Sequence, residues 1–236
     1  MNISFYTAAV GAAQQQERLD VHGNNIANIN NYGFRAKIPS FSSLMTGPIT
    51  GINEDLPRGV GARLEDAETN FNGSTLADTG RSLDYAIEGD GFFALLDPAS
   101  GEISYTRDGS FTKSQFFEDG EEKWYLSDGM GRFVLGRNGQ PIEVDDEKEE
   151  FPVGVFDFVN HNGMLNIGEN RFIPVEKNGA VGLGTGKVVQ GYLEQSNADL
   201  AYEFSKVIES QRSFSLMLKM VTTSDDIEST VNGLRG

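Results

Sequence analysis

The chain has 236 residues, enough for one large or two modest domains with a hydrophobic core. Its 35 acidic and 19 basic residues give a formal net charge of −16 at pH 7, so its surface repels nucleic acid and anionic membranes, and neither is an expected partner. The absence of cysteine excludes disulfides, thiolate metal sites and a cysteine nucleophile.

The first residues, MNISFYTAAVGAAQQQ, lack the pattern of a cleaved secretory signal peptide. They contain no Lys or Arg before Arg18, and Asn2, Ser4 and Thr7 interrupt the apolar run. No later stretch approaches the roughly 20 apolar residues that a membrane-spanning helix needs. We therefore expect a soluble protein that does not insert into a lipid bilayer and is not exported by a cleaved leader.

Residues 4–31 predict an amphipathic helix, because apolar and small side chains recur at alternating steps of four and three residues. Alanine is frequent on this face, and small side chains allow a partner helix to approach closely. The helix is expected to end at Asn30, Asn31, Tyr32 and Gly33, where Asn and Gly favour the left-handed conformation that closes helices. The interface residues that we predict on this helix are Phe5, Ala9, Ala12, Leu19 and Ile26.

The next segment, residues 36–61, predicts a linker or an irregular arm. Most of it reads SFSSLMTGPITGINEDLPRGVG, which is rich in turn-forming residues.

Residues 62–194 predict a β domain. Short runs rich in β-branched and aromatic residues alternate with Asp-Gly and Asn-Gly pairs, which accept the positive φ angles of tight hairpins. Their recurrence indicates a meandering antiparallel sheet or a sandwich. The runs are residues 85–87, 92–96, 103–106, 123–126, 133–135, 152–158, 171–175 and 188–192.

From about residue 200 the pattern predicts one long helix that ends at Gly233, with Ser196 and Asp199 as a capping-box-like start signal. Two rows follow steps of three and four residues and lie about 100° apart on the helix. An ordinary helix that faces a core is the plain interpretation of such a pattern. A helix with a single partner needs only one such row, however, and the second row is evidence for several helical neighbours. The first row is Phe204, Val207, Gln211, Phe214, Leu218 and Val221, and the second is Met217, Met220, Ser224, Ile227, Val231 and Leu234.

The predicted fold class is therefore α+β. We expect a mainly antiparallel β domain whose long N- and C-terminal helices pair as an antiparallel helical or coiled-coil stalk. The predicted domains are residues 1–35 with 195–236 as a terminal helical part, 36–61 as the arm, and 62–194 as the β-rich part.

Catalytic chemistry finds little support in the sequence, and we assign no catalytic, cofactor-binding or metal-binding residue. His22 lies inside the first predicted helix and His161 in a turn, so each has a plain structural interpretation. The glycine-rich residues 182–186 precede a strand instead of opening a helix, which argues against a phosphate loop. Residues 158–169 match several positions of a calcium loop, but Phe158 occupies the first position, so a hairpin turn is favoured.

Several separated motifs resemble the axial proteins of bacterial flagella, the rod, hook and hook-associated group. They occur in the family's order and cover nearly the whole chain. The motifs are QQQERLDVHGNNIANINNYGFRAK at 14–37, LDYAIEGDGFF at 83–93, YTRDGSF at 105–111, QGYLEQSNAD at 190–199 and IESQR at 208–212. Gly23 is a departure, since the family more often has alanine there and a helical glycine costs roughly 1 kcal/mol relative to alanine.

This resemblance implies a structural subunit of the flagellar basal-body rod, not an enzyme. The terminal helices of many copies would form an inner tube and the β domain an outer layer of the drive shaft that transmits torque to the hook. The implied partners are other copies, other flagellar rod and hook proteins and the flagellar export apparatus, and the implied location is the basal body in the cell envelope. Proximal and distal rod positions both stay open.

The alternative that the sequence leaves open is a secreted β-rich module that binds calcium or carbohydrate and dimerises through a helical stalk. In the rod interpretation, one of the two rows of the C-terminal helix closes on residues 4–31 and the other contacts a neighbouring subunit. The sequence does not indicate which row does which.

Overall fold

The computed structural model describes residues 3–46, 58–118, 121–145 and 151–234, and the chain divides into two compact units. The helical unit consists of Met1–Ala27, Lys37–Glu68 and Asp199–Gly236. The β unit consists of Asn28–Ala36 and Thr69–Ala198. The mainly antiparallel α+β fold with a helix near each end of the chain confirms the predicted class.

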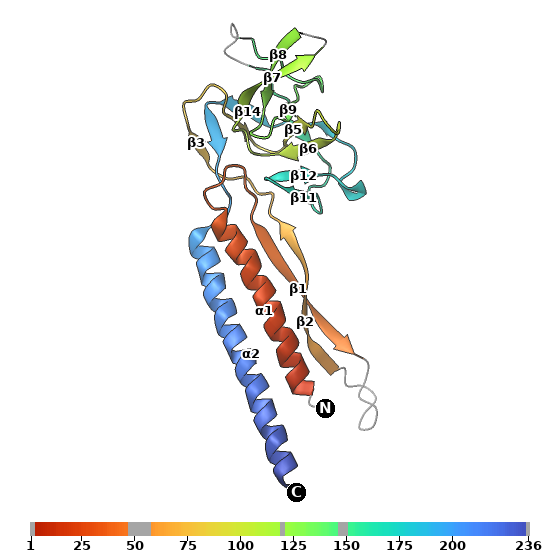
Figure 1. Ribbon diagram of the computed structural model, residues 1–236, viewed down its shortest axis with the longest axis vertical. Helices are drawn as coiled ribbons and strands as arrows, with labels where there is room; N and C mark the ends of the chain where they lie inside the picture. The colour runs from red at the N-terminus through yellow and green to blue at the C-terminus, as the bar shows by residue number, and fades with distance from the viewer. Residues whose placement is uncertain (1–2, 47–57, 119–120, 146–150, 235–236) are drawn as a thin grey trace. The chain divides into compact units, whose positions relative to one another are not determined.

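In the helical unit, helix α1 (Ile3–Ala27) and helix α2 (Leu200–Leu234) lie side by side and run antiparallel (Figure 1). Asn25, near the end of α1, contacts Glu203 near the start of α2, whereas Gly11 in the first half of α1 faces Met217. Strands β1 (Lys37–Thr46) and β2 (Arg58–Thr69) pair with each other, and the pair lies along α1.

Helix α2 begins with a side-chain cap, because Oδ1 of Asp199 accepts a hydrogen bond of 3.0 Å from the backbone amide of Tyr202. The predicted capping box placed Ser196 in this role, which is wrong. The hydroxyl of Ser196 instead accepts from the amide of Ala198, at 3.2 Å, in the turn before the helix. Asp199 caps the helix by itself since it is the residue directly before Leu200.

The segment predicted as an irregular arm is regular at both of its ends, where β1 and β2 form. Its central residues 47–57 lie outside the described part of the chain. The backbone of Lys37 pairs with the amide side chain of Asn25, donating to Oδ1 at 2.9 Å and accepting from Nδ2 at 2.8 Å. A side chain of α1 thus fixes the start of β1, a contact that the serine-rich sequence of the strand does not reveal.

The β unit is built on a seven-stranded sheet in the order β11-β12-β6-β5-β9-β8-β7, in which all neighbours are antiparallel. Three antiparallel pairs, β14 with β4, β15 with β3 and β10 with β13, complete it. The elements are β3 (Leu76–Asp78), β4 (Tyr85–Glu88), β5 (Phe93–Leu96), β6 (Ile103–Thr106), β7 (Thr112–Glu118), β8 (Glu121–Ser127), β9 (Phe133–Val134), β10 (Phe156–Asp157), β11 (Leu165–Gly168), β12 (Arg171–Ile173), η1 (Glu176–Asn178), β13 (Gly182–Leu183), β14 (Lys187–Gln190) and β15 (Tyr192–Glu194).

Each predicted β run contains a strand, although residues 152–158 hold only the short β10. Glycines of four Asp-Gly or Asn-Gly pairs have the positive φ that the turn prediction requires: Gly91, Gly139, Gly163 and Gly179. Gly109 serves a different purpose, because a Cβ there would lie 1.7 Å from the carbonyl oxygen of Tyr85. Its glycine permits a close approach of two backbone segments.

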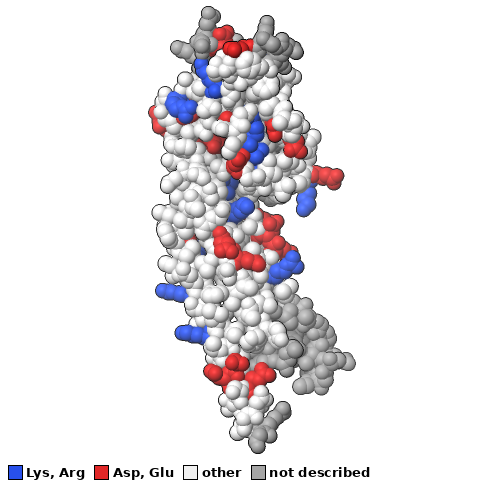
Figure 2. Space-filling model, in the orientation of Figure 1, with Lys and Arg blue, Asp and Glu red and all other residues white. Residues whose placement is uncertain are grey.

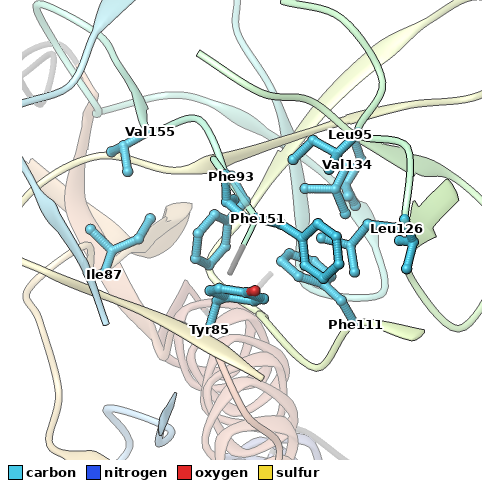
Figure 3. Close-up of a cluster of buried hydrophobic side chains, with 12 residues drawn as sticks. Tyr85, Ile87, Phe93, Leu95, Phe111, Leu126, Val134, Phe151 and Val155 are labelled. Atoms are coloured by element: carbon cyan, nitrogen blue, oxygen red, sulfur yellow. The ribbon is translucent and has the colours of Figure 1, made fainter. Parts of the chain in front are cut away.

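Buried aromatic and aliphatic side chains of residues 85–155 form the main core of the β unit (Figure 3). Phe93 and Phe111 meet edge to face at 5.3 Å between ring centroids, with Leu126 and Val134 fully buried. A second cluster includes Phe92, Tyr105, Phe158 and Phe172. Each of β4, β5 and β6 buries three consecutive residues, so side chains on both faces of these strands are covered and the unit has a core of its own.

Candidate assembly interface

The face of α2 that packs on α1 follows a regular seven-residue spacing. Its positions alternate steps of four and three residues and are buried or half-buried, whereas most of the flanking positions are exposed. The face consists of Glu203, Val207, Ser210, Phe214, Met217, Val221 and Ser224.

The opposing face of α1 is lined by small side chains. Ala8 and Ala12 are buried, and a Cβ at Gly11 would lie 2.7 Å from Sδ of Met217. The larger side chain of α2 therefore enters a space that a glycine leaves open. This arrangement lets the two helices approach closely, as the alanine-rich pattern of residues 4–31 suggested.

A buried polar cluster joins α1, α2 and the start of β1. Nδ1 of His22 lies 2.5 Å from Oε2 of Glu203, and Nδ2 of Asn25 donates to Oε1 of the same carboxylate at 2.9 Å. All three side chains are at most 3% exposed. Because one carboxylate takes hydrogen bonds from two positions of α1, sliding one helix past the other would break them, so this cluster fixes the register of the pair.

Ion pairs border the helix pair near this cluster. Nη1 of Arg18 lies 3.5 Å from Oε1 of Glu209, and Nζ of Lys206 donates to Oε2 at 2.8 Å. The hydrogen bond from Lys206, followed by the charge of Arg18, lowers the pKa of the Glu209 carboxyl. This rim is solvent-exposed at Glu209, so its contribution to stability is small and sensitive to salt.

The structure divides each of the two predicted rows between the helix pair and the surface. In the first row Val207, Phe214 and Val221 are half-buried, and in the second Met217 is half-buried. On α1, Ala12 is buried, Leu19 and Ile26 are half-buried, and Phe5 and Ala9 are exposed. The exposed members of the first row are Phe204, Gln211 and Leu218. The exposed members of the second row are Met220, Ile227, Val231 and Leu234.

The pairing face thus lies between the predicted rows, and α2 exposes large apolar side chains on both sides of it. Figure 2 shows one face of the molecule, where charged side chains on the helical unit are separated by broad stretches of other residues. The first flank comprises Leu200, Phe204, Ile208 and Leu218, and the second comprises Tyr202, Leu216, Met220, Ile227, Val231 and Leu234, each between 45% and 83% exposed.

Sequence reasoning overlooked the polar members of the pairing face. Glu203 and Ser210 fall outside the two predicted rows, which consist mainly of apolar residues, whereas the buried contact of His22 with Glu203 agrees with the structural role predicted for His22. The available signal was their spacing, since Glu203 and Ser210 continue the steps of four and three residues set by Val207 and Phe214.

The β unit contains a second buried ionic cluster. Oε1 of Glu194 accepts from Nη2 of Arg35 at 2.7 Å and from the amide of Ser74 at 2.9 Å, and Oε2 accepts from Nη1 of Arg107 at 3.2 Å. Burial lowers the pKa of Arg107, and the charge of Glu194 opposes this shift. Nearby, Asn197 accepts from the amide of Ala36 and donates to the carbonyls of residues 70 and 72. These polar side chains tie together segments that are distant in sequence.

The loop that resembles a calcium site uses its carbonyl oxygens internally. The fully buried Asn178 donates through Nδ2 to the carbonyls of Asn160, at 2.7 Å, and Asn162, at 3.1 Å. Its Oδ1 accepts from the amide of Val175. Among the described residues, no group of three His, Cys, Asp or Glu side chains is arranged to hold a metal ion. Nor does any helix in the described ranges combine the length and apolarity needed to span a membrane.

Comparison with known proteins relates this architecture to the flagellum. The family model described as flagella basal body rod protein matches residues 5–35. The model of the flagellar hook protein FlgE/F/G D1 domain matches residues 86–155, and that of the flagellar basal body rod FlgEFG protein C-terminal region matches residues 189–234. The three matches follow the order of α1, the β unit and α2.

Curated relatives match along almost the full chain. The flagellar basal-body rod protein FlgG of Bacillus subtilis (strain 168) is 32% identical over an alignment of 261 positions, gaps included. The alignment covers 95% of this chain and 96% of the relative. FlgG of Buchnera aphidicola subsp. Schizaphis graminum is 31% identical with the same coverage. FlgF of Mesorhizobium japonicum is 30% identical and covers 98% of both chains. The chain belongs to the flagellar basal-body rod protein family.

Proposed function

We propose that this chain is a structural subunit of the flagellar basal-body rod, and that its helical unit packs against helical units of other copies and of other rod and hook proteins. The family membership supports the rod as its location. One structural observation supports the role of the helices: α2 keeps large apolar side chains exposed on both sides of the face that packs on α1. Apolar surface of this extent is typical of a site covered by another protein.

Within one subunit, α1 and α2 pair as a two-helix antiparallel coiled coil. The alternating steps of four and three residues on the pairing face of α2 support this, as does Met217 entering the space at Gly11. The exposed flanks are then free for two different neighbours. Contacts through two different surfaces produce an open, heterologous assembly, which extends as a helix instead of closing as a dimer.

The β unit forms the outer layer of the rod, and the packed helices form its inner tube and transmit torque to the hook. The separate core of the β unit supports this division. The chain reaches the basal body through the flagellar export apparatus, as the family resemblance implies. It acts as a structural element without catalysis.

A motility assay tests this function. A strain that lacks the chain should be non-motile, and the native gene should restore swimming. Ile227→Glu places a charge on the second flank of α2, where Ile227 is 55% exposed, so the subunit should fold but fail to assemble. Ser229→Glu, at a neighbouring exposed position, is the matched control and should swim. Normal swimming of the strain without the chain would contradict a rod function.

A further inference from the structure

The outer face of α1 combines small side chains with acidic charge. Its exposed positions alternate steps of four and three residues and lie on the side of the helix away from α2. Four of them are alanine or glycine. The row consists of Ala9, Ala13, Gln16, Asp20, Gly23 and Ala27, with the exposed Glu17 beside it.

Gly23 has no explanation within the subunit. It lies inside α1, about one turn before the last residue, Ala27, at a position where glycine is less favourable than alanine. A Cβ at this position would meet no atom within 4 Å, so no intramolecular contact among the described residues requires its absence. By contrast, Gly11 on the opposite face makes room for Met217. An open position without a side chain permits close approach of another backbone or of a large side chain.

The first flank of α2 has the complementary shape and charge. Leu200, Phe204, Ile208 and Arg212 follow one another at steps of four residues, which is the spacing of a ridge on a helix surface. The three apolar members are 46%, 50% and 50% exposed, and Arg212 is exposed as well. Lys219 adds a second exposed basic side chain on the same side of the helix. The ridge is therefore large and basic, where the outer face of α1 is small and acidic.

The heights of the two surfaces along the helix pair also agree. Met217 lies opposite Gly11 and Glu203 opposite Asn25, so Phe204 is level with the region of Gly23 and Arg212 with the region of Gln16 and Asp20. A second copy placed beside the first at nearly the same height would bring the apolar ridge over Gly23 and Ala27. The same placement would bring Arg212 beside Asp20 and Glu17.

We propose that the outer face of α1 of a second copy of the chain packs on this ridge of α2. Apolar packing at Gly23 and pairing of Arg212 with Asp20 and Glu17 would hold the two copies together. This proposal rests on the proposed rod function and names the surfaces that two neighbouring copies use. The contact is heterologous, because each copy offers its ridge to one neighbour and its small acidic face to another.

Disulfide cross-linking between copies tests the contact, and the chain contains no native cysteine to interfere. Gly23→Cys and Phe204→Cys are introduced into separate chains that carry tags of different size, and the two chains are coexpressed in cells that lack the native one. A disulfide requires Cα atoms within about 7 Å, so a heterodimer that disappears on reduction reports this contact. The matched control replaces Phe204→Cys by Tyr202→Cys, which is exposed at nearly the same height but lies on the second flank of α2, away from the ridge.

The expected result is a heterodimer with Phe204→Cys and none with Tyr202→Cys, in cells that remain motile. Motile cells without the Phe204→Cys heterodimer, or with equal yields from both chains, would overturn the pairing while leaving the rod function intact. A failure of the proposed rod function would be recognised by a different result: cells without any copy of the chain would swim.

A charge exchange tests the same contact without cysteine. Arg212→Glu alone and Asp20→Arg alone should each reduce the swimming radius, because each places like charges opposite one another. The two substitutions in one chain should restore swimming, and coexpression of the two single variants should restore it as well. Circular dichroism of each purified variant shows that it is folded. A single variant that swims normally, or a folded double variant that does not recover, would overturn the proposal.

Discussion

Arg35 and Glu194 form a salt bridge of 2.7 Å between side chains that are no more than 1% exposed. The same carboxylate lies 3.2 Å from Arg107, whose side chain is 4% exposed. One buried anion thus faces two buried cations, and the remaining polar contacts of Arg107 are the backbone carbonyls of residues 87 and 89. Burying ionised groups is unfavourable unless they are paired, so Glu194 is the group on which the whole cluster depends.

Glu194→Gln should destabilise the chain by about 3–5 kcal/mol, because it removes the charge that pairs directly with both buried guanidinium groups. Urea unfolding followed by the fluorescence of Trp124, which lies in the β unit, measures the loss. Glu102→Gln is the matched control at an exposed position, and its unfolding free energy should stay within about 0.5 kcal/mol of the native value. Equal midpoints for the two variants would show that the cluster does not stabilise the fold.

Glu203→Ala should destabilise the helical unit by about 1–3 kcal/mol, because it removes the hydrogen-bond partner of two buried groups, His22 Nδ1 and Asn25 Nδ2. Thermal melting followed by the helical circular dichroism signal measures the effect. Glu228→Ala, at an exposed position near the end of α2, should leave the melting temperature nearly unchanged. If Glu203→Ala melts like the control, the polar cluster does not hold the two helices in register.

Both helices and the β character of the middle region could be predicted from sequence because these depend on local patterns. The seven-residue spacing identifies α2, and the alternation of apolar runs with Asp-Gly and Asn-Gly pairs identifies the strands of the sheet. Strands that lack such patterns were missed. β7 begins Thr112, Lys113, Ser114 and Gln115, and its strand conformation comes from pairing with β8 instead of from a buried face of its own.

The position of the interface could not be predicted because it depends on polar residues that acquire partners only in the folded chain. Glu203 is an ordinary surface residue by composition, yet it is 3% exposed since His22 and Asn25 satisfy its carboxylate. Including it moves the pairing face of α2 to a position between the two apolar rows. The sequence therefore indicates that α2 carries more apolar side chains than a single partner helix needs. Which of these side chains pack on α1 and which are exposed is seen only in the structure.

Gly23→Ala should stabilise the isolated subunit by about 0.5–1 kcal/mol, because alanine is the better helix former and its Cβ would enter open space. Gly11→Ala is the matched comparison on the same helix. Gly11→Ala should not be stabilised in this way, because the added Cβ would come within 2.7 Å of Met217 Sδ and force that side chain to move. Denaturant unfolding of both variants measures the difference. Equal stabilisation by the two substitutions would contradict the packing of Met217 on Gly11.

Asp108→Asn should stabilise the chain at neutral pH. Burial raises the pKa of the Asp108 carboxyl, with smaller contributions from the charges of Asp128 and Asp84, and hydrogen bonds from Ser110 oppose the shift. Oδ1 of Asp108 accepts from both the amide and the hydroxyl of Ser110, and asparagine can keep both bonds. The substitution thus removes the unfavourable buried charge while preserving the local hydrogen bonds.

The sign of the pH dependence follows from this raised pKa. Below the ordinary pKa of aspartate, about 3.9, both the folded and unfolded chains carry the proton, so Asp108 and its asparagine variant should be equally stable. As pH rises toward the raised pKa, the unfolded chain ionises first and the native chain loses stability that the variant retains. The difference in unfolding free energy, measured by urea titration at several pH values, should therefore grow from near zero in acid to a constant value at neutral pH. A variant that is less stable than the native chain at neutral pH would show that the ionised form of Asp108 is favoured by its surroundings.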